Sequence, residues 1–172
     1  MSPVGAIASN GELSLKQVNI VGSSADQGGG GIHVGKGGAL VMKDSSIRDC
    51  HTNQMGGGVD VDDGDLDLIG IVLEGNMAAQ GGSIAAKGEG SMIKIKQGAI
   101  TGNTGVEMAG GIYVMEGQLL LQVTWSPRFV PSCVCLQRAA CVEYEHSCWQ
   151  RCTFVSLSRL VYFGQRHQPL CD

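Results

Sequence analysis

The most conspicuous chemical feature of this sequence is a run of carboxylates, Asp60-Val61-Asp62-Asp63-Gly64-Asp65-Leu66-Asp67. Asp62, Asp63 and Asp65 fall on a single expected turn, and several carboxylates on one turn can hold Ca²⁺, a hard cation that takes oxygen ligands. The spacing matches neither an EF-hand loop nor the Ca²⁺-binding glycine-rich nonapeptide repeat. The competing interpretation is a solvated turn whose Asp residues suit turn geometry and keep the surface soluble. For this turn, the two hypotheses are therefore Ca²⁺ held by these three residues and no cofactor at all.

Carbohydrate cleavage is the catalytic alternative for the same carboxylates. Glycoside hydrolysis uses two carboxyl groups at a defined separation, and Asp62-Asp63 would supply a pair. A polysaccharide lyase would add a base, for which Arg48 and a few lysines are available. The lysines alternate with apolar residues expected inside the protein, so they are expected on a wet outer face. These lysines are Lys43, Lys94 and Lys96. The sequence therefore predicts no catalytic residue.

The elements that must position these side chains recur along residues 1–124. A Gly-Gly pair is followed by an apolar alternating segment in successive copies, and the first apolar residues of these copies are separated by 27, 25 and 28 residues. A degenerate earlier copy precedes them by 25 residues. These anchors are Ile7, Ile32, Val59, Ile84 and Ile112.

Each copy contains further apolar positions that align in the same way. The second set is the alternating pairs Leu13/Leu15, Leu40/Met42, Leu66/Leu68, Ile93/Ile95 and Leu119/Leu121, and the third set is Ile20, Ile47, Leu73 and Ile100. Each unit therefore predicts three short strands separated by turns, with no helical periodicity. Three short strands in each unit of about 26 residues are typical of one coil of a parallel β-helix. A β-sandwich, the competing fold, gives no reason for such a recurrence.

Glycine and asparagine mark the expected corners of the coil. The Gly pairs let the chain turn without a Cβ clash and permit positive φ. Asn76 and Asn103 occupy equivalent corners, where stacked Asn side chains can satisfy turn groups between coils. In a neighbouring unit Cys50 takes that place, where a small buried thiol is tolerated. The structural glycines are Gly57, Gly58, Gly81, Gly82, Gly110 and Gly111.

The outward face of the first strand is a candidate binding stripe. It would present Ala8, His33, Asp60, Ala85 and Tyr113 on successive coils. A stacking platform for sugars needs several aromatic residues, and this stripe holds a single one. Its residues are accordingly expected to be ordinary surface side chains.

The Gly-Gly-x-[Ile/Val] and [Ile/Leu]-x-x-Asn motifs resemble the repeats of right-handed β-helix proteins of the pectin-lyase-like superfamily. Within it they look closest to the passenger repeats of polymorphic outer-membrane proteins and related autotransporter adhesins. The resemblance covers about residues 5–124. It departs from the family pattern at Ser83, where those repeats carry Ala, and at Leu73 and Ile100, where they carry Phe. It implies a right-handed coil and an extracellular or cell-surface location, although the opening MSPVGAIASNGE predicts no signal peptide.

Residues 125–172 have a different composition. Of 27 Gly, residues 1–124 hold 26, whereas the tail holds six of the seven Cys and five of the six Arg. The Cys-x₂-Cys spacing of a zinc knuckle is missing. The tail is open to four interpretations: disordered chain, a disulfide-stapled or zinc-bound cap, a strand or short helix over residues 153–163 that covers the solenoid end, or a gene-model artefact such as a missed intron or frameshift. Its candidate ligands are Cys133, Cys135, Cys141, His146, Cys148, Cys152 and Cys171.

Composition and charge exclude two classes of function. The net charge of −4 offers no basic face to nucleic acid, and no apolar run is long enough for a membrane-spanning helix. The sequence predicts an all-β, right-handed parallel β-helix of about four to five coils with an irregular Cys-rich tail. Its predicted function is that of a structural or adhesive segment of a larger surface or secreted protein, binding carbohydrate or a protein ligand, in an array that continues beyond it. The alternative is a fragment of a carbohydrate-active β-helix enzyme of the pectate lyase or polygalacturonase kind.

Overall fold

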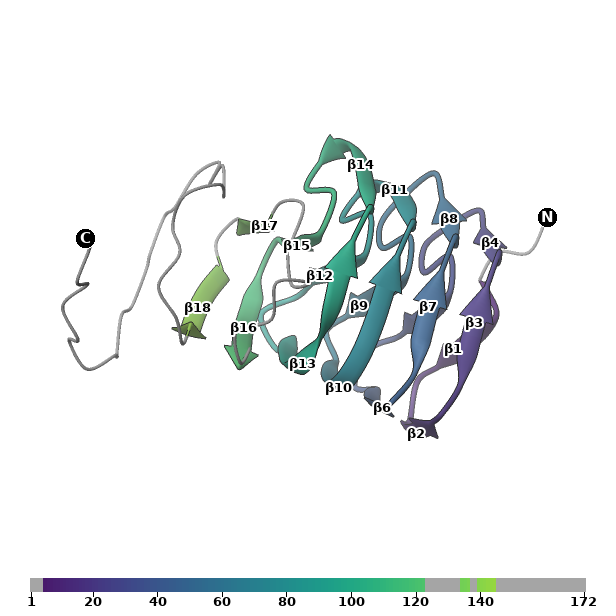
Figure 1. Cartoon of the computed structure of the whole chain (residues 1–172). Coiled ribbons are helices and arrows are strands. Elements are labelled where there is room, and N and C mark those ends of the chain that lie inside the picture. The colour runs from purple at the N-terminus through teal and green to yellow at the C-terminus, as the bar shows by residue number, and fades with distance from the viewer. Residues whose placement is uncertain (1–4, 123–133, 137–138, 145–172) are drawn as a thin grey trace, which may run out of the picture.

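The computed structural model describes residues 5–122, 134–136 and 139–144. These residues form an all-β solenoid of about four turns, without a helix in the described ranges. Figure 1 shows the strands stacked along one axis, with the strands of the first turn (purple) at one end. Neighbouring strands from successive turns pair in parallel throughout. The predicted fold class is therefore confirmed.

The first sheet carries the five predicted anchors. Its register places Ile7 opposite Ile32, Ile32 opposite Val59, Val59 opposite Ile84 and Ile84 opposite Ile112. From Ile32 onward these side chains are fully buried, and they form a ladder at the ordinary strand spacing of about 4.8 Å. The strands, in order, are β1 (Ile7–Ser9), β5 (Ile32–Val34), β9 (Val59–Asp62), β12 (Ile84–Lys87), β15 (Ile112–Val114) and β17 (Val134–Leu136).

The second sheet carries both remaining apolar sets. Leu66 lies between Leu40 and Ile93, and Leu73 lies between Ile47 and Ile100. All of these residues point into one core that also holds the anchors. The main strands, in chain order, are β2 (Glu12–Lys16), β6 (Ala39–Lys43), β10 (Asp65–Glu74), β13 (Met92–Thr101), β16 (Gly117–Gln122) and β18 (Ala139–Tyr144), and the short strands are β3 (Asn19–Val21) and β7 (Ser46–Arg48).

The third sheet departs from the predicted three-strand unit. Its strands follow the asparagine corner, and the second and third apolar sets share the second sheet. The strands are short, and the only side chains buried in the first three of them are small, Ala25, Thr52 and Ala78, so no apolar alternation marks them in the sequence. The strands are β4 (Ser24–Ala25), β8 (His51–Thr52), β11 (Met77–Gln80) and β14 (Thr104–Met108). Below, the first coil is β1–β4, the second β5–β8, the third β9–β11 and the fourth β12–β14.

The glycine pairs are required where the backbones of successive coils approach each other. A Cβ on Gly57 would lie 2.3 Å from the carbonyl oxygen of Gly82, and one on Gly58 would lie 2.6 Å from that of Ser83. Positive φ occurs three residues before each anchor from Ile32 onward, at Gly29 (59°), Gly56 (67°), Gly81 (64°) and Ala109 (44°). These distances leave no room for a side chain at Gly57 or Gly58, and the left-handed residues Gly56 and Ala109 each lie one position before their Gly pair.

Two strands of the tail lie within the described ranges. β17 pairs in parallel with β15, and β18 pairs in parallel with β16. These strands extend the first and second sheets past residue 124. The rest of the tail, with most of its predicted zinc or disulfide ligands, lies outside the described residues.

Candidate functional site

The three candidate Ca²⁺ ligands lie in three different environments, and each makes its own contacts. Asp62 ends β9, where its Oδ2 lies 3.3 Å from Lys87 Nζ. Asp63 lies on the turn with φ of 53°; its Oδ1 accepts a hydrogen bond from the Gly90 N–H at 3.0 Å. Asp65 begins β10 and is exposed. Among residues 5–122 and the two tail strands, no three His, Cys, Asp or Glu side chains are grouped to hold a metal ion. Ca²⁺ binding here stays a prediction.

The burial of Asp60 contradicts the expectation that the outward residues of the first sheet form a surface stripe. The alternation along β9 does turn it away from the core, but only 3% of the residue is exposed. Its Oδ2 lies 3.0 Å from His33 Nδ1 on the preceding coil. A Cβ on Gly28 would lie 2.8 Å from that same oxygen, so the turn before β5 closes over the carboxylate. Its other oxygen, Oδ1, is buried and has no hydrogen-bond partner.

Two further members of the stripe are buried. Ala85 and Tyr113 form a second, smaller apolar cluster on the outer side of the first sheet, packed against Met55, Ala109 and Met115. Residues from the turns thus cover this face, and the expectation of a row of surface side chains was wrong. Sequence alternation assigns the side of the sheet, but whether a turn folds over that side is decided by tertiary packing.

The contact with Asp60 raises the pKa of His33 above its ordinary value of 6.5. The hydrogen bond to Asp60 is the main cause, and the charges of Asp60 and Asp62 act in the same direction. Partial burial and the charge of Lys87 oppose the rise. An Asp-held imidazole of this kind can carry a proton near neutral pH.

The ion pairs of the described residues share a pattern: each joins the third coil to a neighbouring coil. Lys36 Nζ lies 3.6 Å from Asp63 Oδ2, and Arg48 Nε lies 3.5 Å from Glu74 Oε2. With His33–Asp60 and Lys87–Asp62, the carboxylate always belongs to the third coil. That coil carries acidic residues and neither Lys nor Arg: Asp60, Asp62, Asp63, Asp65, Asp67 and Glu74.

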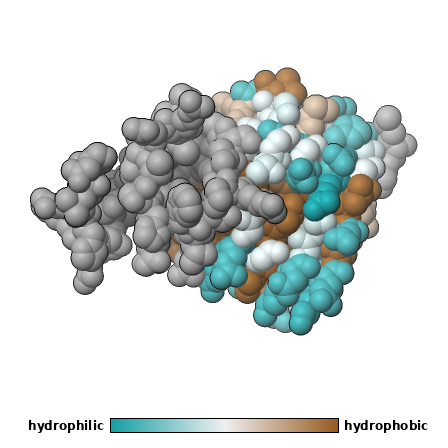
Figure 2. Space-filling model, in the orientation of Figure 1, coloured by the Kyte–Doolittle hydropathy of each residue, from teal (hydrophilic) through white to brown (hydrophobic). Residues whose placement is uncertain are grey.

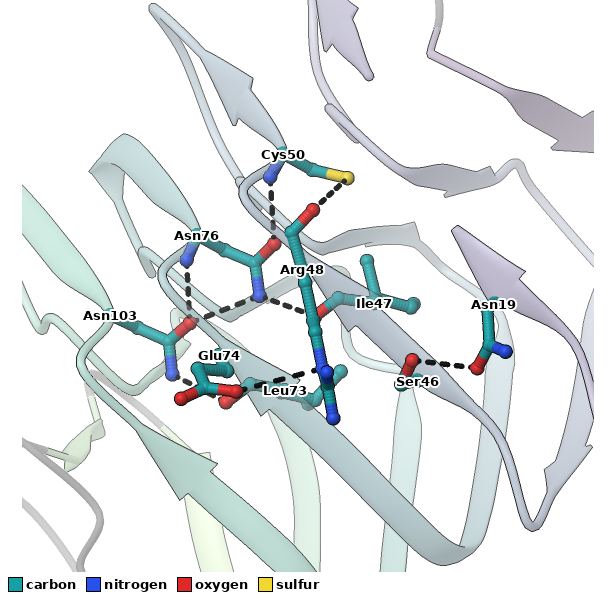
Figure 3. Close-up of polar contacts among 9 residues, drawn as sticks. All are labelled: Asn19, Ser46, Ile47, Arg48, Cys50, Leu73, Glu74, Asn76 and Asn103. Carbon is teal, nitrogen blue, oxygen red and sulfur yellow. Dashed lines mark hydrogen bonds and ion pairs between the residues drawn. The ribbon is translucent and has the colours of Figure 1, made fainter. Parts of the chain in front are cut away.

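The asparagine corner forms a buried ladder (Figure 3). Asn76 Oδ1 accepts from the Cys50 N–H at 3.0 Å, and Asn76 Nδ2 donates to the Ile47 carbonyl at 2.9 Å. Asn103 Nδ2 donates to the Leu73 carbonyl at 2.9 Å. Each side chain therefore bonds the backbone of the preceding coil, as predicted for stacked asparagines.

Cys50 takes the equivalent place on the second coil. Its thiol is fully buried and donates to the Arg48 carbonyl at 3.2 Å. Burial raises the pKa of this thiol, which keeps it in the protonated form. The predicted substitution of a small thiol at the asparagine position is confirmed.

An open depression, which no sequence motif predicted, lies on the outer face of the second sheet. Ser46 Oγ donates to Asn19 Oδ1 at 2.8 Å within it, beside the Arg48–Glu74 pair (Figure 3). Hydrophilic and apolar residues intermingle over this side of the rod (Figure 2). Hydroxyl, amide and guanidinium groups beside two valines suit a polar ligand with an apolar edge. The depression has a volume of about 530 Å³ and is lined by Asn19, Val21, Asp44, Ser45, Ser46, Arg48, Gly70 and Val72.

Comparison with models of protein families, with curated proteins and with solved structures found no match to this chain. Within the described residues, no helix is long and apolar enough to cross a membrane.

Proposed function

We propose that this chain is a structural or adhesive segment of a larger surface or secreted β-solenoid protein, which presents side chains on a rigid rod and performs no catalysis. One observation carries the proposal: the carboxylates that a catalytic role would employ are engaged in bonds between coils. Asp60 pairs with His33, Asp62 with Lys87 and Asp63 with Lys36. Groups used in this way hold successive coils in register, which is what a rod requires.

The core supports the same role. Its apolar ladders run through every described coil and meet in one cluster, and the Asn76–Asn103 ladder runs alongside them. In a solenoid each coil contacts only its neighbours, so the stability of the rod is the sum of such interfaces. The repeat motifs, which resemble those of polymorphic outer-membrane proteins and autotransporter adhesins, support a surface or secreted location.

The depression beside Arg48 is the proposed ligand-presenting face, for a carbohydrate or a protein surface. Screening the full chain against arrayed glycans and cell-surface proteins tests it. We expect Arg48→Ala to abolish binding of any ligand found, and Lys36→Ala, an equal loss of charge on another turn, to preserve it. Binding that survives Arg48→Ala would place the ligand elsewhere and refute this face.

The enzymatic alternative has a direct test. We expect the full chain, incubated with polygalacturonate and Ca²⁺ across the pH range, to release neither new reducing ends nor unsaturated product. Product formation that disappears in Asp62→Asn or Asp63→Asn would overturn the non-catalytic proposal.

A further inference from the structure

Within residues 5–122, 134–136 and 139–144, all three sheets end at the first coil. β1, β2 and β4 are the terminal strands of the first, second and third sheets. Four apolar residues of this coil pack against the core but are only partly buried, whereas the residues opposite them in the second coil are buried. Among the described residues, no strand pairs with the outer edges of these three strands, and an unpaired strand edge invites pairing with another strand. The four residues are Ile7, Leu13, Leu15 and Val18.

The sequence of β2 is complementary to itself in the antiparallel direction. β2 reads Glu12-Leu-Ser-Leu-Lys16, with its charged ends and central Ser14 exposed. When two copies of β2 run antiparallel with their Ser14 residues opposite each other, Glu12 of one copy faces Lys16 of the other. Leu13 of one copy then faces Leu15 of the other. None of the ion pairs of the described residues uses Glu12 or Lys16. Opposite charges directly across an antiparallel pair are stabilising.

The backbone hydrogen bonds of β2 agree with this register. The Ala39 N–H donates to the Gly11 carbonyl, and the Gln17 N–H donates to the Lys43 carbonyl. Because the bonding direction alternates along a strand, the odd-numbered residues of β2 bond toward β6. The N–H and C=O groups of Glu12, Ser14 and Lys16 therefore face the open edge, where antiparallel pairing about Ser14 turns them into hydrogen-bonded pairs.

Other registers lose one of these agreements. A shift by one residue opposes open-edge groups to residues that already bond β6, and it breaks the pleat that keeps both Leu side chains inside. A shift by two opposes either Glu12 or Lys16 to Ser14, so both charged residues of each strand lose their oppositely charged partner. The arrangement about Ser14 also places Leu13 and Leu15 of both copies on one face, so the two cores become continuous.

We propose that two copies of this chain join through the open edges of β2, in an antiparallel dimer whose two-fold axis passes by Ser14. This isologous contact extends the second sheet across both copies and covers the exposed end of the core. It goes beyond the proposed role of the rod, because it concerns how two rods are joined and does not depend on what they present.

Sedimentation equilibrium of the full chain, with reductant present to exclude intermolecular disulfides, tests this contact. We expect a monomer–dimer equilibrium. Lys16→Glu places Glu opposite Glu twice, and Glu12→Lys places Lys opposite Lys twice. Each variant should raise the dimer dissociation constant by about tenfold. Lys43→Glu, the same change one coil inward and in register with Lys16, should leave it unchanged.

Combining the charge changes makes the test specific. The double variant Glu12→Lys with Lys16→Glu restores both pairs and should dimerise like the parent chain. Mixing the two single variants should give a heterodimer in preference to either homodimer. Ser14→Pro, which removes an N–H from the open edge only, should give a monomer whose far-ultraviolet circular dichroism is still that of β structure. A monomeric parent chain, or association indifferent to these changes, would overturn the proposal.

Discussion

The side-chain oxygen of Asn103 accepts hydrogen bonds from both nitrogens of Asn76, at 2.9 Å from the backbone nitrogen and 3.0 Å from Nδ2. Asn76 in turn bonds Cys50 and Ile47 of the second coil with its own side chain. The two residues therefore hold three successive coils at one corner, in an interior where a lost partner cannot be replaced by water.

Asn76→Ala is expected to lower the free energy of unfolding by about 3 kcal/mol, because it leaves the buried Cys50 N–H and Ile47 carbonyl without their partner. Chemical denaturation of the full chain measures the change. The control is Asn53→Ala on an exposed position, for which we expect a change below about 0.5 kcal/mol. Equal effects of the two substitutions would show that the ladder adds nothing to stability.

The His33–Asp60 pair makes stability depend on pH. The pKa of His33 is raised in the folded protein, so the folded state binds the proton more tightly than the unfolded chain does. Its stabilisation is complete below the ordinary pKa of 6.5 and is lost as the pH rises through the folded pKa. His33→Gln should flatten this fall, whereas His51→Gln, on an exposed position, should preserve it. Denaturation midpoints measured from pH 6 to 9 give the comparison, and an unchanged slope in His33→Gln would contradict it.

Gly57→Ala is expected to destabilise the solenoid by about 2 kcal/mol or more, because the added methyl meets the carbonyl oxygens of Gly82 and Met77 on the next coil. Gly57 does not have positive φ, so the effect reports the approach of the coils alone. Gly11→Ala is the matched control, since a Cβ there has nothing within 4 Å. It should leave stability unchanged or raise it slightly. Thermal unfolding measures the melting temperatures of the two variants, and equal values would refute the steric role of Gly57.

The melting temperature of the full chain is expected to be the same in Ca²⁺ as in Mg²⁺ at equal ionic strength. Lys87 and Lys36 already face Asp62 and Asp63, so a cation would have to displace them. Calorimetric scans with each metal measure this. A saturable rise specific to Ca²⁺ that disappears when Asp62, Asp63 and Asp65 are changed together to Asn would establish the site predicted from the sequence.

The sequence by itself determined the stacking of the coils. Five anchors from Ile7 to Ile112 predicted the register of the first sheet, because an inward apolar residue must recur once per turn for the core to be continuous. The same alignment placed His33 beside Asp60, one coil apart, and marked Asn76 and Asn103 as equivalent corners.

Only the tertiary structure decided what lies over the outside of those coils. The burial of Asp60, Ala85 and Tyr113 depends on turns that fold back over the first sheet, and alternation along a strand carries no information about such a cover. The third sheet was missed for a related reason, since its small inward residues leave no apolar signal. Local patterns report which side of a strand meets the core, whereas contacts between a turn and the outer face arise from the path of the whole coil.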